Sequence, residues 1–279
     1  MDKLFLYADE NIKTAAGRPS VTPMLISDDK NHPGVMISPG GGYGGVCEDT
    51  EGSPIGRKFN ELGYHAFILD YRTAPSRWPS PQCDAMRAMR MLRAGREKFR
   101  LVAGQLAVCG FSAGAHLAAS LGTVCKCVED GSPDELENFS YQPDVMILCY
   151  GVLSLAPWSH NGTRDNLLGV ENAGDWQGFS PAENVSADTP PAFLMHTVCD
   201  QLVPFENSMA FARAMAESGR PCELMLNYWG EHGMLLGKKT LDVVMWPEMA
   251  DRFMQSVYRS AADPQFMERY TNGWQRKQK

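Results

Sequence analysis

Short apolar runs alternate with longer segments of helical spacing along most of the chain. The runs are rich in β-branched and aromatic residues and end at glycine, proline or polar residues, which is typical of strands. The predicted strands are Leu4–Ala8, Met24–Ser27, Gly34–Ser38, His65–Asp70, Gln105–Cys109, Asp144–Cys149, Ala192–His196 and Glu223–Asn227. The predicted helices are Pro54–Leu62, Asp84–Lys98, Ala113–Val124, Pro204–Ser218 and Val243–Ser260.

This alternation predicts the α/β fold class, with a mostly parallel sheet of about eight strands and helices on both faces. The first two strands are the exception, because they could form an antiparallel edge. No internal repeat and no linker divides the chain, so we expect a single domain over residues 1–279.

Residues 151–191 interrupt the pattern. They are rich in Gly, Asn, Ser, Asp and Pro and have little periodicity. A connection this long within a compact domain is usually a functional lid or binding loop. We therefore expect a lid-like insertion that borders a binding site.

Composition narrows the range of partners. The 279 residues carry 26 Lys and Arg against 33 Asp and Glu, a net charge of −7, which argues against nucleic acid or an anionic membrane as the main partner. No stretch approaches the roughly 18 apolar residues of a membrane helix, and the first residues lack the pattern of a secretory signal. Most of the eight cysteines stand singly in apolar runs, without zinc-site spacing. We therefore expect reduced thiols, no metal and a cytoplasmic protein.

The strongest chemical motif is the segment Gly110-Phe111-Ser112-Ala113-Gly114, which matches G-x-S-x-G. It lies between a predicted strand and a predicted helix, as a nucleophile on a sharp turn requires. Gly110 and Gly114 permit the strained backbone, and the N-terminal end of the helix favours developing negative charge. The motif predicts Ser112 as a nucleophile.

A second glycine-rich turn, Pro39–Gly45, follows the predicted strand Gly34–Ser38. No Lys-Ser or Lys-Thr pair follows these glycines, so the turn does not match a phosphate-binding loop. Glycine lets backbone N–H groups approach a substrate oxyanion closely. We expect such donors at Gly41 and Gly42, joined by Ala113 after the nucleophile.

Hydrolases with this type of turn carry an acid and then a histidine after the serine in chain order. His232 fits, because it follows the last predicted strand in a turn and could reach the serine hydroxyl. The other histidines precede Ser112, or lie on the helix behind it, in the irregular segment or at a strand end: His32, His65, His116, His160 and His196.

Asp200 is the expected acid, since it follows the predicted strand Ala192–His196 and stands just before a helix. A carboxylate at that place could orient the imidazole of His232 and stabilise its charged form. It could also simply be a carboxylate near a helix N-terminus. Asp165, Asp175 and Asp188 lie in the irregular segment and lack this placement.

Together these segments resemble the α/β-hydrolase esterases, and within them the small bacterial acetylesterases of the acetyl-xylan-esterase-like group, which are related to the hormone-sensitive-lipase-like branch. The resemblance extends from about Gly34 to about Gly233. Further shared phrases are Glu51-Gly52, Asp70-Tyr71-Arg72-Thr73-Ala74-Pro75, His116-Leu117-Ala118, Asn166-Leu167-Leu168-Gly169, Phe179-Ser180-Pro181, Thr189-Pro190-Pro191 and Val203-Pro204.

Two departures from the family pattern stand out. Pro39 replaces the usual histidine of a His-Gly-Gly-Gly turn, which fits the acetylesterase-like subgroup. Thr197 replaces the usual glycine of a His-Gly-x-x-Asp phrase, and could shift the loop that carries Asp200.

The resemblance implies a serine carboxylester hydrolase that needs no cofactor and acts on a short acyl ester, such as an acetylated sugar. Tyr43, Trp78 and Trp158 could offer stacking faces to such a sugar, or could simply pack where the 151–191 segment meets the domain. An amidase such as an arylformamidase, or a peptidase, could use the same residues, and a non-catalytic ligand-binding protein is a more distant alternative.

The apolar stripe Met245, Met249, Phe253 and Met254 could face the core or a second copy of the chain in a homo-oligomer.

Overall fold

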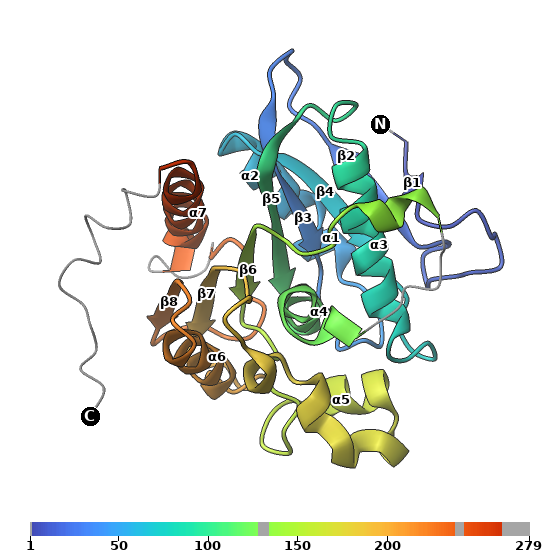
Figure 1. Ribbon diagram of the computed structural model, residues 1–279. Helices are drawn as coiled ribbons and strands as arrows, with labels where there is room; N and C mark the ends of the chain where they lie inside the picture. Colours follow the sequence, from blue (N-terminus) through green and yellow to red (C-terminus); the bar gives the residue numbers. More distant parts are fainter. Residues whose placement is uncertain (1, 128–133, 238–242, 264–279) are drawn as a thin grey trace.

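The computed structural model describes residues 2–127, 134–237 and 243–263. Within these residues, one eight-stranded sheet runs in the order β1-β2-β4-β3-β5-β6-β7-β8 (Figure 1). The strands are β1 Leu4–Phe5, β2 Ser20–Met24, β3 His32–Ser38, β4 His65–Asp70, β5 Leu101–Phe111, β6 Val145–Cys149, β7 Ala192–Thr197 and β8 Cys222–Asn227. The α-helices are α1 Glu48–Glu51, α2 Ser53–Glu61, α3 Ser80–Ala94, α4 Ala113–Gly122, α5 Asn161–Leu168, α6 Glu206–Glu217 and α7 Trp246–Ala262.

The first two strands form an antiparallel edge, while β3 to β8 are parallel to one another. This confirms the predicted fold class. The second strand differs from the predicted Met24–Ser27, because it lies at Ser20–Met24. It contains Pro23, which cannot donate to a neighbouring strand, but β1 pairs only with Ser20 and Val21. Pro23 therefore lies where one side of the strand is open.

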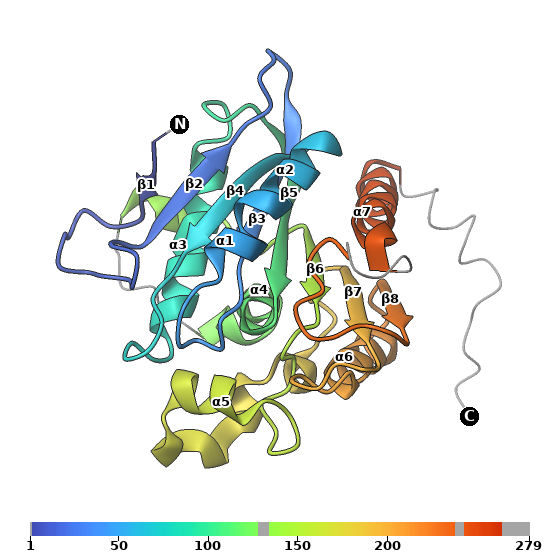
Figure 2. The same ribbon diagram turned by 180° about the vertical axis from the view of Figure 1, so that it is seen from behind.

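Helices cover both faces of the sheet, and successive strand residues point to opposite faces. In β5, Leu106 and Val108 pack with α3, α4 and α6, whereas Ala107 and Cys109 pack with α2 and α7. Figures 1 and 2 show these two helical layers from opposite sides. In the apolar stripe at the start of α7, Phe253 and Met254 are buried in the second layer. None of the described helices is long and apolar enough to cross a membrane.

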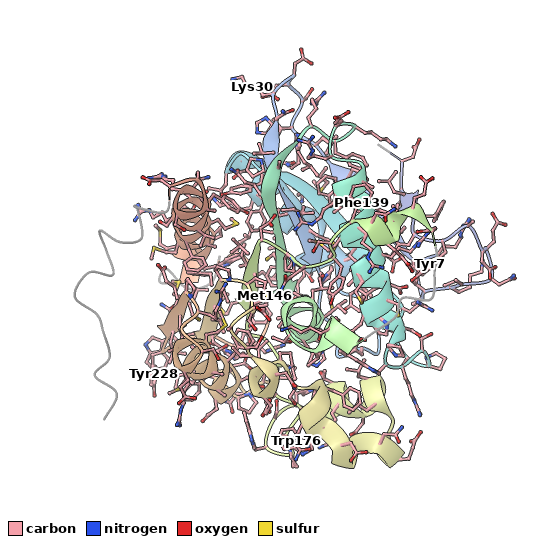
Figure 3. All side chains as sticks on the ribbon, in the orientation of Figure 1. Tyr7, Lys30, Phe139, Met146, Trp176 and Tyr228 are labelled. Carbon is pink, nitrogen blue, oxygen red and sulfur yellow. The ribbon has the colours of Figure 1, made fainter. Side chains whose placement is uncertain are left out.

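The 151–191 segment lies beyond the carboxyl ends of the central strands (Figure 1). Figure 3 labels Trp176 in this segment and Lys30, in the loop before β3, at the opposite end of the molecule. The segment is more helical than its sequence indicates, since it contains α5 and the 3₁₀ helices Val170–Phe179 and Pro181–Asn184. These elements are too short for a clear apolar period to develop. They place a layer of side chains over the edge at which β5, β7 and β8 end.

Candidate active site

Ser112 occupies the sharp turn between β5 and α4. Its backbone has φ 52° and ψ −121°, a conformation that is costly for a residue with a side chain. The flanking glycines are needed because the strand and helix approach closely here. A Cβ on Gly114 would overlap the carbonyl oxygen of Ser38, and a Cβ on Gly110 would overlap that of Gly114. The serine hydroxyl is therefore held at the carboxyl edge of the sheet.

The structure brings Ser112, His232 and Asp200 together from the ends of three strands. The Nε2 atom of His232 lies 3.0 Å from the Oγ of Ser112, and its Nδ1 lies 2.8 Å from the Oδ2 of Asp200. The side chain of Asp200 is 1% exposed and that of His232 is 18% exposed. The hydroxyl of Ser112, the imidazole of His232 and the carboxylate of Asp200 thus form a continuous series of hydrogen-bond contacts, the arrangement that nucleophilic catalysis requires.

Asp200 is buried but well supplied with hydrogen-bond donors. Its Oδ1 accepts the backbone N–H groups of Leu202 and Val203, each at 2.9 Å. Burial by itself would raise the pKa of the Asp200 carboxyl, but hydrogen bonds from His196, His232 and the Val203 N–H lower that pKa well below its usual range. The carboxylate therefore stays charged opposite the imidazole.

His196 also belongs to this site, although its position at the end of a predicted strand by itself gives no sign of such a role. It is fully buried, and its Nε2 lies 3.3 Å from the Oδ2 of Asp200 and 3.0 Å from the carbonyl oxygen of Val203. Both of these oxygens are acceptors, so Nε2 carries the ring proton, and the Nδ1 of the neutral ring accepts from the hydroxyl of Ser208 at 2.8 Å. The signal in the sequence was its position four residues before Asp200.

The glycine turn after β3 provides backbone donors beside the serine. Gly41 and Gly42 have φ values of 131° and 62°, in the region that glycine adopts without strain. Across the described residues, no acceptor is bonded to the N–H of either glycine or of Ala113, the first residue of α4. These groups remain available for an oxyanion. The N–H of Gly40, in contrast, is already bonded to Glu51.

Glu51 supports this turn from behind. Its Oε2 accepts the Gly40 N–H at 2.6 Å, and its Oε1 accepts the Tyr150 hydroxyl at 2.8 Å. The ring of Tyr150 packs edge-on against that of His232, with centroids 5.1 Å apart. Burial raises the pKa of the Glu51 carboxyl, and the bonds from Gly40 and Tyr150 partly offset that rise. In the sequence Glu51 stood out only as part of a shared phrase, without a role.

Thr197, the departure from the usual glycine, holds the histidine loop in place. Its hydroxyl donates to the carbonyl oxygen of Gly230 at 2.9 Å, two residues before His232. The side chain is 2% exposed, so this bond is shielded from water. Thr197 therefore connects the end of β7 with the loop that follows β8.

A cleft of about 510 Å³ opens over Ser112 and His232. Its size lies within the range of small-molecule binding sites and exceeds the needs of an acetyl group alone. The cleft is lined by Gly41, Gly42, Cys47, Thr50, Glu51, Ser112, His160, Gly162, Asn166, Leu202, His232, Gly233 and Leu235.

The predicted aromatic stacking faces do not line this cleft. Tyr43 corrects the expectation most clearly: its ring is fully buried, and its hydroxyl is bonded to the Nδ1 of His116 at 2.8 Å. Trp78 packs edge-on against Phe179, with ring centroids 5.0 Å apart, at the seam with the 151–191 segment. Trp158 is 49% exposed on the surface of that segment. The sequence around an aromatic residue in a loop does not show whether its ring packs within the protein or stacks on a ligand.

The arrangement can perform acyl transfer. It offers a hydroxyl nucleophile with a base, a charged group behind the base, and N–H donors where negative charge would develop. Across the described residues, no three His, Cys, Asp or Glu side chains are grouped so that they could hold a metal ion.

Comparison with known proteins agrees with this geometry. The family model BD-FAE matches residues 26–215. Endo-1,4-beta-xylanase B of Butyrivibrio fibrisolvens is 33% identical over 221 residues, which cover 77% of this chain and 34% of that protein. The acetylxylan esterase of Xylanibacter ruminicola is 28% identical over 225 residues, or 78% of this chain and 43% of that protein. The chain thus spans less than half the length of these two curated relatives.

A solved structure extends the likeness to nearly the whole chain. The acetyl ester-xyloside bifunctional hydrolase of Caldicellulosiruptor lactoaceticus superposes with a TM-score of 0.85 at 35% identity, covering 92% of this chain and 96% of that one. The predicted resemblance to α/β-hydrolase esterases is therefore confirmed. With most of its length matched by the family model and the same fold in a relative of similar size, the chain belongs to the BD-FAE family of α/β hydrolases.

Proposed function

We propose that this protein is a serine esterase that removes short acyl groups, above all acetyl, from the hydroxyls of carbohydrates. One observation carries the proposal. Ser112, held at a strained turn, lies 3.0 Å from His232, which lies 2.8 Å from the buried carboxylate of Asp200. The names of the relatives support an acetyl ester as substrate, since they include an acetylxylan esterase and an acetyl ester-xyloside hydrolase.

In the first half of the reaction, the Oγ of Ser112 attacks the ester carbonyl while His232 takes the hydroxyl proton at Nε2. The negative charge on the former carbonyl oxygen is stabilised by the N–H groups of Gly41, Gly42 and Ala113. His232 then gives its proton to the departing alcohol oxygen as the C–O bond breaks. An acyl group remains on Ser112.

In the second half, a water molecule replaces the alcohol. His232 accepts a proton from this water as its oxygen attacks the acyl carbon, and the same three N–H groups stabilise the second oxyanion. The bond to Ser112 breaks, the serine oxygen recovers the proton from His232, and the carboxylic acid leaves. Asp200 keeps its charge throughout and stabilises the imidazolium each time it forms.

The proposal is tested by replacing the nucleophile. Ser112→Ala should lower kcat on p-nitrophenyl acetate by at least about a thousandfold and abolish labelling by a fluorophosphonate probe. Ser256→Ala, on the exposed face of α7, is the matched control and should behave as wild type. Full turnover by Ser112→Ala would rule out this mechanism.

A parallel assay separates the ester from the activated-amide alternative. Acetylated xylose, p-nitrophenyl esters of increasing acyl length and N-formylkynurenine are compared as substrates of the wild-type protein. We expect the highest kcat/KM for acetyl esters and a decline as the acyl chain lengthens. A higher kcat/KM for N-formylkynurenine than for any ester would instead indicate an amidase.

A further inference from the structure

His160 lines the same cleft as Ser112 and His232, although no step of the reaction above uses it. It lies at the start of α5 and is half-buried. A Cβ placed on Gly42, one of the expected oxyanion donors, would lie 3.8 Å from the Cε1 of His160. The imidazole therefore forms part of the wall directly beside the reacting centre.

The contacts of His160 decide where its ring proton lies. The ring caps α5, because its Nδ1 accepts the backbone N–H of Thr163 at 3.2 Å. The Thr163 hydroxyl lies 2.7 Å from the same nitrogen. A backbone N–H can only donate, so Nδ1 must be an acceptor and the proton of the neutral ring is on Nε2. No bond to Nε2 is found in the part of the chain that the structure describes, which leaves this N–H for a ligand.

Asn166, six residues after His160 on α5, adds an acceptor to the same wall. Its Nδ2 donates to the carbonyl oxygen of Gly42 at 2.9 Å, which identifies the nitrogen of the amide and leaves Oδ1 as the other atom. Among the described residues, no donor is bonded to this Oδ1. The wall formed by α5 thus pairs one donor with one acceptor, the combination that recognises a hydroxyl group.

The imidazole of His160 stays neutral in the same cleft as the group that protonates the alcohol. Burial, followed by the charge of His232, lowers the pKa of the His160 imidazole. His160 and His232 line the same cleft, and His232 is the group that protonates the leaving alcohol. A neutral His160 can donate a hydrogen bond there without opposing the imidazolium that forms on His232.

We propose that His160 and Asn166 select the alcohol part of the substrate, with the Nε2–H of His160 donating to a hydroxyl or ether oxygen next to the acylated position and the Oδ1 of Asn166 accepting from a hydroxyl. The site then prefers esters of polyhydroxylated alcohols, that is sugars, over esters of simple alkyl alcohols. This inference rests on the proposed esterase function and refines its substrate class.

The test compares two acetyl esters that differ only in their alcohol. Wild type, His160→Ala and His160→Asn are assayed by acetate release from acetylated xylopyranose and from ethyl acetate. Asn is a favoured helix cap, so His160→Asn keeps the bond to the Thr163 N–H but cannot extend an imidazole donor into the cleft. Both variants should lose about tenfold in kcat/KM on the sugar ester, mainly through a higher KM, and change less than twofold on ethyl acetate.

The controls separate the possible failures. If His160→Asn hydrolyses the sugar ester as wild type does, His160 is only a helix cap and the inference is overturned. An equal loss on both esters also overturns it, because the residue would then not discriminate between alcohols. If wild type releases no more acetate than Ser112→Ala does from either ester, the proposed esterase function itself is wrong.

Discussion

Glu51 shows how one buried side chain can set the geometry of the reacting centre through the residues that it binds. Its two carboxyl oxygens hold the Gly40 N–H on one side and the Tyr150 hydroxyl on the other. Gly40 leads directly into the glycine turn, and Tyr150 packs against His232. One buried carboxyl therefore joins the expected oxyanion site to the base, and a small displacement on either side would weaken transition-state stabilisation.

The first prediction concerns Glu51. Glu51→Ala should lower kcat on p-nitrophenyl acetate by about tenfold or more with little change in KM, because the glycine turn loses its anchor and the donors move from their place. Glu51→Gln should recover most of the loss, since its amide oxygen can still accept the Gly40 N–H. Steady-state kinetics of both variants check this. Equal defects in the two variants, with both folded by circular dichroism, would contradict it.

At the level of secondary-structure elements, α6 fastens the start of the 151–191 segment to the domain. Asn207, on α6, is fully buried, and its Oδ1 accepts the backbone N–H groups of Leu153 and Ser154 at 3.0 and 2.9 Å. The hydroxyl of Ser159 donates to the same oxygen at 2.9 Å. These bonds lead directly into His160 and α5, so the position of the cleft wall depends on one side chain of another element.

The second prediction follows from that attachment. Asn207→Ala should lower the free energy of unfolding by about 3 kcal/mol, because two buried N–H groups lose their acceptor. It should also raise KM, since the wall of the cleft becomes less well ordered. Asn207→Asp keeps the accepting oxygen and is the matched control. Urea denaturation and steady-state kinetics measure both effects, and an unchanged unfolding midpoint in Asn207→Ala would count against the proposed attachment.

At the scale of the whole molecule, buried neutral histidines tie stability to pH. His116, on α4 behind Ser112, is fully buried between the Tyr43 hydroxyl and the carbonyl oxygen of Phe179. Burial lowers the pKa of its imidazole to about 4, although the bond to Phe179 favours the charged form. His65 is buried elsewhere in the fold, and burial likewise lowers its pKa to about 4.

The third prediction gives the sign of this dependence. In the unfolded chain a histidine has a pKa of about 6.5, so between about pH 6.5 and pH 4 the unfolded state binds a proton that the folded state does not. The stability that neutral His116 provides is complete above that range and is lost as pH falls through it. The free energy of unfolding, measured by urea denaturation at a series of pH values, should therefore rise with pH more steeply in wild type than in His116→Gln over this range. The expected difference in slope is about 1.4 kcal/mol per pH unit. If the free energy of unfolding has the same pH dependence in both proteins, His116 has the same pKa in the folded and unfolded states and the prediction is wrong.

The strands, their mostly parallel arrangement and the turn at Ser112 could be predicted because they depend on local patterns. Apolar runs determine strands, and a serine with a glycine two residues away on each side, after a strand, determines a sharp turn. Chain order then indicated Asp200 and His232, and the structure places His232 within hydrogen-bond reach of both Ser112 and Asp200. The second strand, Ser20–Met24, lies earlier in the chain than predicted, because Pro23 makes this segment look unlike a strand in the sequence.

Tertiary structure alone decided which side chains surround these three residues. Glu51 meets Tyr150 across 99 positions of sequence, and Asn166 meets Gly42 across 124. Tyr43 is buried rather than open to a ligand for the same reason. Periodicity reports on neighbours within a strand or a turn of helix, whereas contacts over such separations depend on strand order and on how the 151–191 segment packs. The amino-acid sequence by itself therefore determined the turn at Ser112 and the chain order of Asp200 and His232, and the packing of distant segments determined the walls of the cleft.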